Sequence, residues 1–341
     1  MKSICNTLAA LLLVLFCAAG AALGQTTSAQ ISGTVVDPTG AVVVGATVTL
    51  QNEETSETRR TTTNEVGNFV FPALVPGRYQ ISIEAAGFRS TTQRGLVLTA
   101  NDRRFLGAIK LELGNVSETV TVEAQAVQVQ TSSAENASLL SSDQLSYLST
   151  RGRDVISLLR IIPGVTPGND AESLGGTFGT SLPAVNGQSS GFNQVSLDGQ
   201  SGTDVDITGS FNGATSMDAI AEVKVLMNNY QAEYGRNASA VINIVSKSGT
   251  RDFHGSAYWF KRNEALNANN FFNNRQSLER PDYRHDIYGG TIGGPVFIPG
   301  KFNTNRDKLF FFYSREQLKT FTPQSPGTVT MPTALERAGD F

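Results

Sequence analysis

The sequence has few residues of the kinds that support covalent or metal chemistry. Its 341 residues include 2 cysteines and 2 histidines, and both cysteines lie within the first 17 positions. A disulfide framework or a cysteine-ligated metal is therefore not expected in the main part of the chain. The 27 Lys and Arg nearly balance the 30 Asp and Glu without a long basic run, so nothing indicates nucleic-acid binding. With 33 glycines and only 17% charged residues, the composition favours β structure with many turns.

The first residues have the pattern of an export signal. Lys2 gives a positive start, an apolar stretch covers residues 8–16, and small residues precede a predicted cleavage between Gly24 and Gln25. A lipoprotein signal acylated at Cys17 is disfavoured, because bulky Phe16 stands where such a signal has a small residue. We therefore expect residues 1–24 to be a signal peptide. No later apolar run of about 20 residues occurs, so a membrane role would require strands.

Residues 25–114 are predicted to form a small β-sandwich. Tyr79, Ile81 and Ile83 alternate with polar residues, and so do Ile109, Leu111 and Leu113, as in half-buried strands. Turn-forming residues separate such stretches at 37–40, 64–67 and 76–77.

The same region resembles the carboxypeptidase regulatory-like domain. The resemblance rests on Gly33-x-Val35-x-Asp37-x-x-Gly40, Gly45-Ala46-x-Val48-x-Leu50, Asn64-x-x-Gly67-x-Phe69-x-Phe71-x-x-Leu74-x-Pro76-Gly77-x-Tyr79 and Ala86-Gly87-Phe88. It implies a transthyretin-like sandwich without catalytic residues. Two roles remain open, a recruitment or ligand-contact module and a folded spacer.

Residues 115–136 read as a linker. Ser117 to Ala124 is β-prone, and the polar stretch after it lacks aromatic residues. An exposed strand of this kind can add to the sheet edge of a partner. On pattern alone, a last strand of the sandwich is the favoured interpretation.

Residues 137–250 are predicted to form a mixed α and β domain. Ser141 or Ser142 can cap one helix, and a second places apolar residues at helical spacing from Val155 to Ile162. Strands are expected at 194–197, 219–226 and 240–245. In their order along the chain, several motifs resemble the plug domain of TonB-dependent outer-membrane receptors: Pro163-Gly164, Asn186-Gly187, Leu197-Asp198-Gly199, Glu233-Tyr234-Gly235-Arg236 and Asn243 to Thr250.

Residues 251–341 hold 16 of the 28 aromatic residues, and Asp252–Phe260, Ile287–Phe297 and Lys308–Lys319 read as strands. Long alternating strands with aromatic girdles are typical of outer-membrane barrels. Phe253-His254-Gly255-Ser256 and Tyr288-Gly289-Gly290 resemble the first barrel strands of Oar-like TonB-dependent receptors, which carry a carboxypeptidase regulatory-like domain before the plug. About three to five strands fit here, fewer than a closed barrel needs, so we expect an N-terminal fragment of a longer receptor.

The resemblance also gives the linker a role. It implies that Thr119, Val120, Thr121, Val122 and Ala124 are a TonB box, the segment that pairs with TonB in the periplasm. The implied partners are the TonB-ExbB-ExbD complex, outer-membrane lipid and an extracellular ligand, for which sugars, peptides and metal chelates all remain possible.

Constellations for catalysis are weak. Gly187-Gln188-Ser189-Ser190-Gly191 matches a nucleophile elbow but lacks the buried strand before it and the helix after it. The segment that begins at Asp204 starts like a calcium-binding loop, but Thr215 stands where the loop needs a bidentate Glu. A zinc site is disfavoured because His254 and His285 have no third ligand. We expect no catalytic residue, cofactor or metal.

The predicted fold class is thus mainly β with some α, comprising a sandwich, an α+β plug and the first strands of an incomplete barrel. The predicted function is ligand import through the outer membrane, with the sandwich in the periplasm. The alternative is a secreted β-rich adhesion or carbohydrate-binding protein. Extraction from outer membranes only by detergent would favour the receptor.

Overall fold

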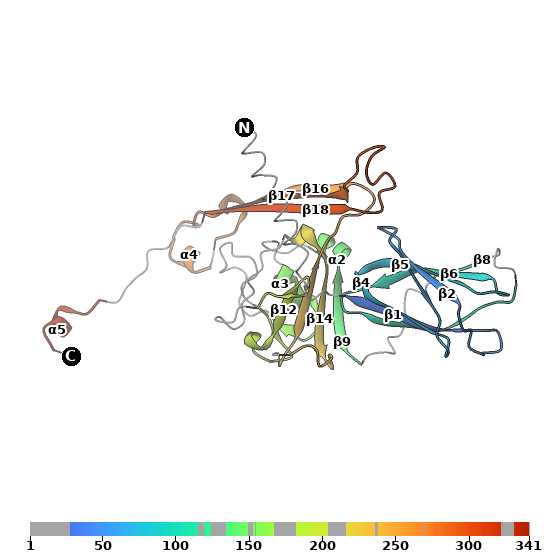
Figure 1. Cartoon of the computed structure of the whole chain (residues 1–341). Helices are drawn as coiled ribbons and strands as arrows, with labels where there is room; N and C mark the ends of the chain where they lie inside the picture. The colour runs from blue at the N-terminus through green and yellow to red at the C-terminus, as the bar shows by residue number, and fades with distance from the viewer. Residues whose placement is uncertain are drawn as a thin grey trace, which may run out of the picture.

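A computed structural model describes most of the chain after the first 27 residues. The described residues are 28–114, 119–123, 134–148, 153, 155–166, 182–203, 216–235, 238–269, 271–321 and 331–340. They form three β systems that follow one another along the chain, with only short helices between strands (Figure 1). Within these ranges no helix is both long and apolar enough to cross a membrane.

The first system is a sandwich of two sheets. One sheet has the order β4-β1-β7, and the other has the order β3-β2-β5-β6-β8. The strands are β1 (Ala29–Val36), β2 (Thr47–Asn52), β3 (Thr58–Thr62), β4 (Asn68–Leu74), β5 (Gly77–Glu84), β6 (Ser90–Leu98), β7 (Arg103–Lys110) and β8 (Thr119–Glu123).

The sandwich core follows the period-2 pattern of the sequence. Tyr79, Ile81 and Ile83 all lie buried between the sheets, as predicted. Leu113 was expected to share the buried face of Leu111, and this is wrong, because Leu111 is fully buried whereas Leu113 is 69% exposed. The reason is that β7 ends at Lys110, so the strand alternation does not extend to Leu113.

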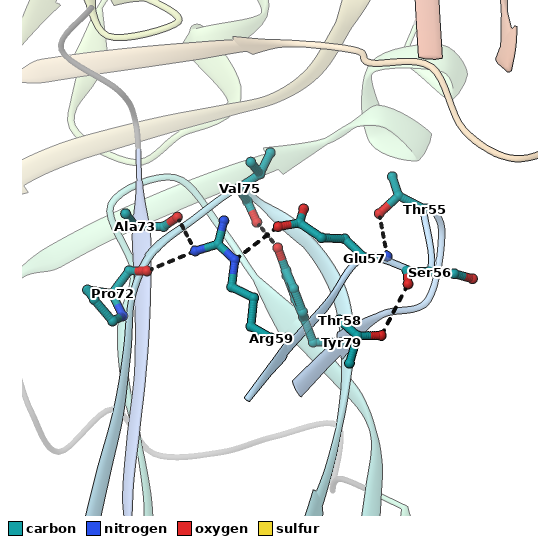
Figure 2. Close-up of polar contacts among 9 residues, drawn as sticks. All are labelled: Thr55, Ser56, Glu57, Thr58, Arg59, Pro72, Ala73, Val75 and Tyr79. Carbon is teal, nitrogen blue, oxygen red and sulfur yellow. Dashed lines mark hydrogen bonds and ion pairs between the residues drawn. The ribbon is translucent and has the colours of Figure 1, made fainter. Parts of the chain in front are cut away.

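Polar contacts join the two sheets at one end of the sandwich (Figure 2). Arg59 of β3 donates through Nη1 to the carbonyl oxygens of Pro72 (3.2 Å) and Ala73 (3.0 Å) on β4, and its Nε binds Glu57 Oε1 at 3.0 Å. On β5, the Tyr79 hydroxyl donates to the carbonyl oxygen of Val75 at 2.7 Å. These contacts fix the loops at this end relative to the core.

The second system, here called the middle domain, is a mixed sheet with the order β13-β12-β15-β14-β9 and helices over one face. Ser141 caps α2 with a capping box, and Val155, Leu158, Leu159 and Ile162 are buried as expected. Its elements are β9 (Asn136–Ser141), α2 (Ser142–Tyr147), α3 (Val155–Leu158), η2 (Leu159–Ile161), β10 (Val165–Thr166), β11 (Ala184–Val185), η3 (Ser190–Phe192), β12 (Gln194–Leu197), β13 (Gln200–Ser201), η4 (Met217–Ala219), β14 (Ile220–Asn228) and β15 (Val241–Ser246).

The third system, here called the C-terminal sheet, is antiparallel with the order β16-β17-β18. Its strands are β16 (His254–Asn263), β17 (Arg284–Pro295) and β18 (Phe310–Phe321), and the short helices of this region are η5 (Glu264–Leu266), α4 (Phe271–Arg275) and α5 (Ala334–Arg337). In Figure 1 the sheet extends along one side of the middle domain, while the sandwich lies beside the β9 edge.

The two faces of the C-terminal sheet differ. Strand register places Trp259 beside Tyr288, and Ile292 beside Tyr313, on one face, where all four are exposed. Arg315 shares this face and lies between Tyr313 and the exposed Phe321, so charged and apolar side chains are interspersed there. The opposite face presents Tyr258 and Glu316 toward the middle domain.

Candidate functional site

The candidate TonB box lies at the edge of the sandwich. Its residues Thr119 to Val122 fall in β8, which pairs in parallel with β6 in the register Ser90 to Thr119 and Thr92 to Thr121. Strand β8 is an edge strand of this sheet, so the segment lies in the sandwich, as the interpretation from its pattern alone predicted. Ala124 lies outside the described residues, as do Gly24 and Gln25 of the predicted signal cleavage site.

The Pro163-Gly164 and Asn186-Gly187 motifs lie together at the short β10 and β11 pair. The Asn186 backbone N–H donates to the Gly164 carbonyl oxygen at 2.8 Å. Gly164 has a φ of +85°, which favours glycine, and a Cβ there would also lie 2.6 Å from Asn186 Oδ1. Asn186 and Gly187 both have positive φ, which is typical of a tight turn. These two motifs therefore have a structural role at one turn.

Leu197-Asp198-Gly199 is joined to the strand that carries the last motif. Asp198 Oδ1 accepts from the Ser246 backbone N–H at 2.8 Å, and Oδ2 accepts from the Ser246 hydroxyl at 2.7 Å. The Asp198 N–H donates in turn to the Ile244 carbonyl oxygen. Asp198 and Gly199 have positive φ, so the motif forms a turn that binds the end of β15.

The Glu233-Tyr234-Gly235 motif contacts the sandwich. Tyr234 accepts a hydrogen bond from Asn101 Nδ2 at 2.7 Å, and Glu233 lies 3.5 Å from Arg103 in a half-exposed ion pair. Burial raises the pKa of the Tyr234 hydroxyl to about 12. Arg236 lies outside the described residues.

Buried charges lie where the sandwich meets β14. Lys224 Nζ binds Glu135 Oε1 at 3.1 Å and donates to the Ala100 carbonyl oxygen at 3.2 Å, while Glu222 Oε1 accepts from the Ala100 N–H at 2.5 Å. The Lys224 and Glu135 side chains are only 8% and 4% exposed. Burial raises the pKa of the Glu222 carboxyl and that of Asp102, and Lys224 opposes both shifts.

A second polar cluster joins the middle domain to the C-terminal sheet. Arg153 pairs with Asp218, and its guanidinium lies over the rings of Tyr258 and Phe260 at 4.7 and 4.3 Å from their centroids. The Tyr258 hydroxyl donates to Glu316 Oε2 at 2.7 Å, and the Glu316 side chain is 5% exposed. Strands β16 and β18 thus meet the middle domain through hydrogen-bonded polar groups.

The residues considered for catalysis do not converge. Ser189 precedes η3 and makes no side-chain capping bond, and no helix of more than one turn follows it in the described segment 182–203. Within the described parts of the chain, no three His, Cys, Asp or Glu side chains are grouped as metal ligands would be. The calcium-like segment 204–215 is outside the described residues.

Two regions of the chain match family models of known domains. A family model described as carboxypeptidase regulatory-like domain matches residues 30–113, and one described as outer membrane beta barrel domain matches residues 245–341. The TonB-dependent transporter Oar of Myxococcus xanthus is 28% identical over 319 residues, which cover 86% of this chain. The chain resembles the Oar-like TonB-dependent receptors.

The similarity to Oar covers 27% of that transporter's length, so this chain spans about a quarter of the relative it matches. Among solved structures, the siderophore receptor PirA from Acinetobacter baumannii is similar with a TM-score of 0.39 and 21% identity, over 54% of this chain and 24% of that one. A ferric enterobactin receptor from Pseudomonas aeruginosa gives 0.38 and 16%, over 56% and 26%. The match to the carboxypeptidase regulatory-like domain precedes the match to the outer membrane beta barrel domain along the chain.

Several residues that form contacts between domains were not predicted from the sequence. Lys224 and Glu222 lie in a predicted strand, but their partner Ala100 is more than 120 positions away. Arg153 and Glu316 are likewise far apart in sequence. One sequence signal pointed to the contact with Ala100. Glu222 and Lys224 flank an apolar residue in a predicted strand, so two opposite charges lie on the same face of that strand.

Proposed function

We propose that the chain forms part of a TonB-dependent outer-membrane receptor that binds an extracellular ligand and imports it. Residues 1–24 are the export signal, 25–114 the periplasmic sandwich, 115–136 the linker, 137–250 the plug and 251–341 the first strands of the barrel. TonB, energised by ExbB and ExbD, pulls on the box segment and rearranges the plug. No covalent chemistry takes part.

The contact between the middle domain and the C-terminal sheet carries this proposal. A plug fills the lumen of a barrel, and barrel strands alternate polar lumen-facing with apolar lipid-facing side chains. Tyr258 and Glu316 face the middle domain and bind Arg153 and Ser216 there, while Trp259 on the alternate face is 67% exposed. This arrangement supports a plug on the inner side and lipid on the outer side.

The position of β9 supports the release mechanism. Within the described sheet, β9 is an edge strand that pairs with β14 alone, and its first residue, Asn136, follows the linker. A pull on the linker therefore acts first on the end of an edge strand. Opening this edge strand breaks backbone hydrogen bonds to one neighbour, β14, whereas a central strand is bonded on both sides.

The position of β8 supports TonB binding. In the described part of the sandwich, β8 pairs with β6 on one side only. Its other edge presents backbone N–H and C=O groups to which an extended segment of TonB can add as a further strand.

Deletion of residues 117–124 from the complete receptor tests the proposal. We expect uptake to fail while ligand binding at the cell surface survives, because the barrel and its loops remain. A deletion of equal length at residues 125–132 shortens the linker and keeps the box segment, and serves as the matched control. Uptake that is unchanged by the first deletion would remove the box assignment. A receptor found in the periplasm or medium rather than the outer membrane would remove the function.

A further inference from the structure

Three turns of the sandwich gather at one end of its sheets, here called the loop end: residues 53–57 between β2 and β3, 75–76 between β4 and β5, and 99–102 between β6 and β7. Strand register places them together, because Asn52 pairs with Tyr79 and Gly77 pairs with Leu98. Two contacts of the loop end reach different parts of the molecule, in addition to the Asn101 to Tyr234 hydrogen bond described above.

The first contact holds one residue of the 99–102 turn, Ala100, through hydrogen bonds to its backbone N–H and C=O groups. Ala100 is fully buried, and both of its backbone polar groups bind side chains of β14. Glu222 accepts its N–H at 2.5 Å and Lys224 donates to its carbonyl oxygen at 3.2 Å. Since Glu222 and Lys224 are two residues apart on one strand, they lie on the same face and hold Ala100 between them.

The second contact joins the 53–57 turn to the chain just before β16. The Arg251 N–H donates to the Glu54 carbonyl oxygen at 3.2 Å, and Arg251 Nη1 donates to Ser56 Oγ at 2.8 Å. The other guanidinium nitrogen reaches the carbonyl oxygen of Asn305, in the connection between β17 and β18, at 3.4 Å. The 53–57 turn is thus tied to two segments that border the C-terminal sheet.

The loop end is built to hold its shape. Figure 2 shows Arg59 binding Glu57 and two β4 carbonyl groups, and Tyr79 binding the Val75 carbonyl oxygen. Ser56 and Asn101, one in each contacting turn, have φ of 61° and 55°, a conformation that non-glycine residues adopt at a cost unless their surroundings fix it. Rigid turns lose little conformational entropy when they dock.

We infer that the loop end of the sandwich is a clasp that holds the middle domain and the C-terminal sheet together. Because one rigid body makes both contacts, opening one contact loosens the other. The inference rests on the proposed function, in which the clasp bridges plug and barrel on the periplasmic side and its opening precedes plug rearrangement. The sandwich is then a working part of the receptor, rather than a spacer.

Hydrogen exchange of two backbone amides tests the clasp in the purified full chain in detergent micelles, without TonB. The Ala100 N–H reports the first contact and the Arg251 N–H the second, because each is held by a partner in another domain. Ala100→Leu overfills the first contact, and we expect exchange at Arg251 to rise about tenfold or more, as for the loss of one hydrogen bond with a charged group. Arg251→Ala should raise exchange at Ala100 likewise.

Ala41→Leu, at an exposed turn of the same domain, is the control and should change neither reporter. Amides between β2 and β5 should keep their protection in every variant, which shows that the sandwich remains folded. If either variant leaves the distant reporter within about twofold of the unmodified chain, the contacts are independent and the clasp is refuted. A receptor that shows the coupling but transports nothing would refute the proposed function and leave the clasp intact.

Discussion

Replacement of Lys224 by methionine gives a sharp test of the buried charges between sandwich and middle domain. Methionine keeps an unbranched side chain that fills the same space, but it cannot donate to Glu135 or to the Ala100 carbonyl oxygen. The Lys224 and Glu135 side chains are 8% and 4% exposed, so solvent screens their 3.1 Å ion pair weakly. Three carboxyl groups, those of Glu135, Glu222 and Asp102, lose a nearby cation.

The expected cost follows from this burial. Removal of one partner of a buried ion pair costs about 3 to 5 kcal/mol, because the remaining charge stays in a poorly solvated place. Glu135 directly precedes the edge strand β9 and can move toward water when β9 opens, which favours the lower end of that range. We therefore expect the free energy of opening β9 from β14 to fall by about 3 kcal/mol, equivalent to exchange about a hundredfold faster.

Native-state hydrogen exchange of the β9 and β14 amides measures this opening. The double variant Glu135→Gln with Lys224→Met removes both charges, and it should regain at least half of the lost stability, since a neutral pair carries no buried charge. Exchange in Lys224→Met that rises less than about threefold would refute the reasoning, because the pair would then act like a surface ion pair. A double variant as unstable as the single one would refute it equally.

Three further predictions concern other contacts. Burial raises the pKa of the Glu222 carboxyl, so docking of Ala100 is favoured most below the ordinary pKa of that carboxyl and weakens as pH rises through the raised value. Glu222→Gln keeps the acceptor oxygen but removes the titration, so it should flatten the pH dependence of this docking, measured by exchange of the Ala100 N–H. Arg153→Met should lower the opening free energy of the middle domain from the C-terminal sheet by about 1 to 3 kcal/mol, measured by fluorescence of the single Trp259 during thermal unfolding. Tyr79→Phe should destabilise the sandwich by about 1 kcal/mol through the lost hydrogen bond, measured by exchange of core amides.

Each of these changes has a control at an exposed position. Glu65→Gln should not alter the pH profile, and Arg160→Met should not shift the fluorescence transition, because both side chains lie at the surface. Tyr147 is 87% exposed, so Tyr147→Phe should leave the exchange of core amides unchanged. A control that matches its test variant would show that the effect is not specific to the contact.

The sequence predicted the strands in which apolar and polar residues alternate clearly, but it did not decide between two roles for the box segment. Ile81 and Ile83 alternate with polar residues and are buried as expected, and β14 lies within two residues of the stretch predicted at 219–226. The box segment had two interpretations, because a five-residue β-prone stretch pairs equally well with its own domain or with a partner. Its pairing with β6 depends on which sheet edge the fold leaves open.

The sequence by itself determined the buried faces of most sandwich strands, because these follow from the local alternation of apolar and polar residues. Only the tertiary structure decided how the domains meet. Ala100 carries no recognisable signal, since its role lies in a backbone N–H and C=O that every non-proline residue has. It becomes a contact only where the fold brings Glu222 and Lys224 to both sides of it.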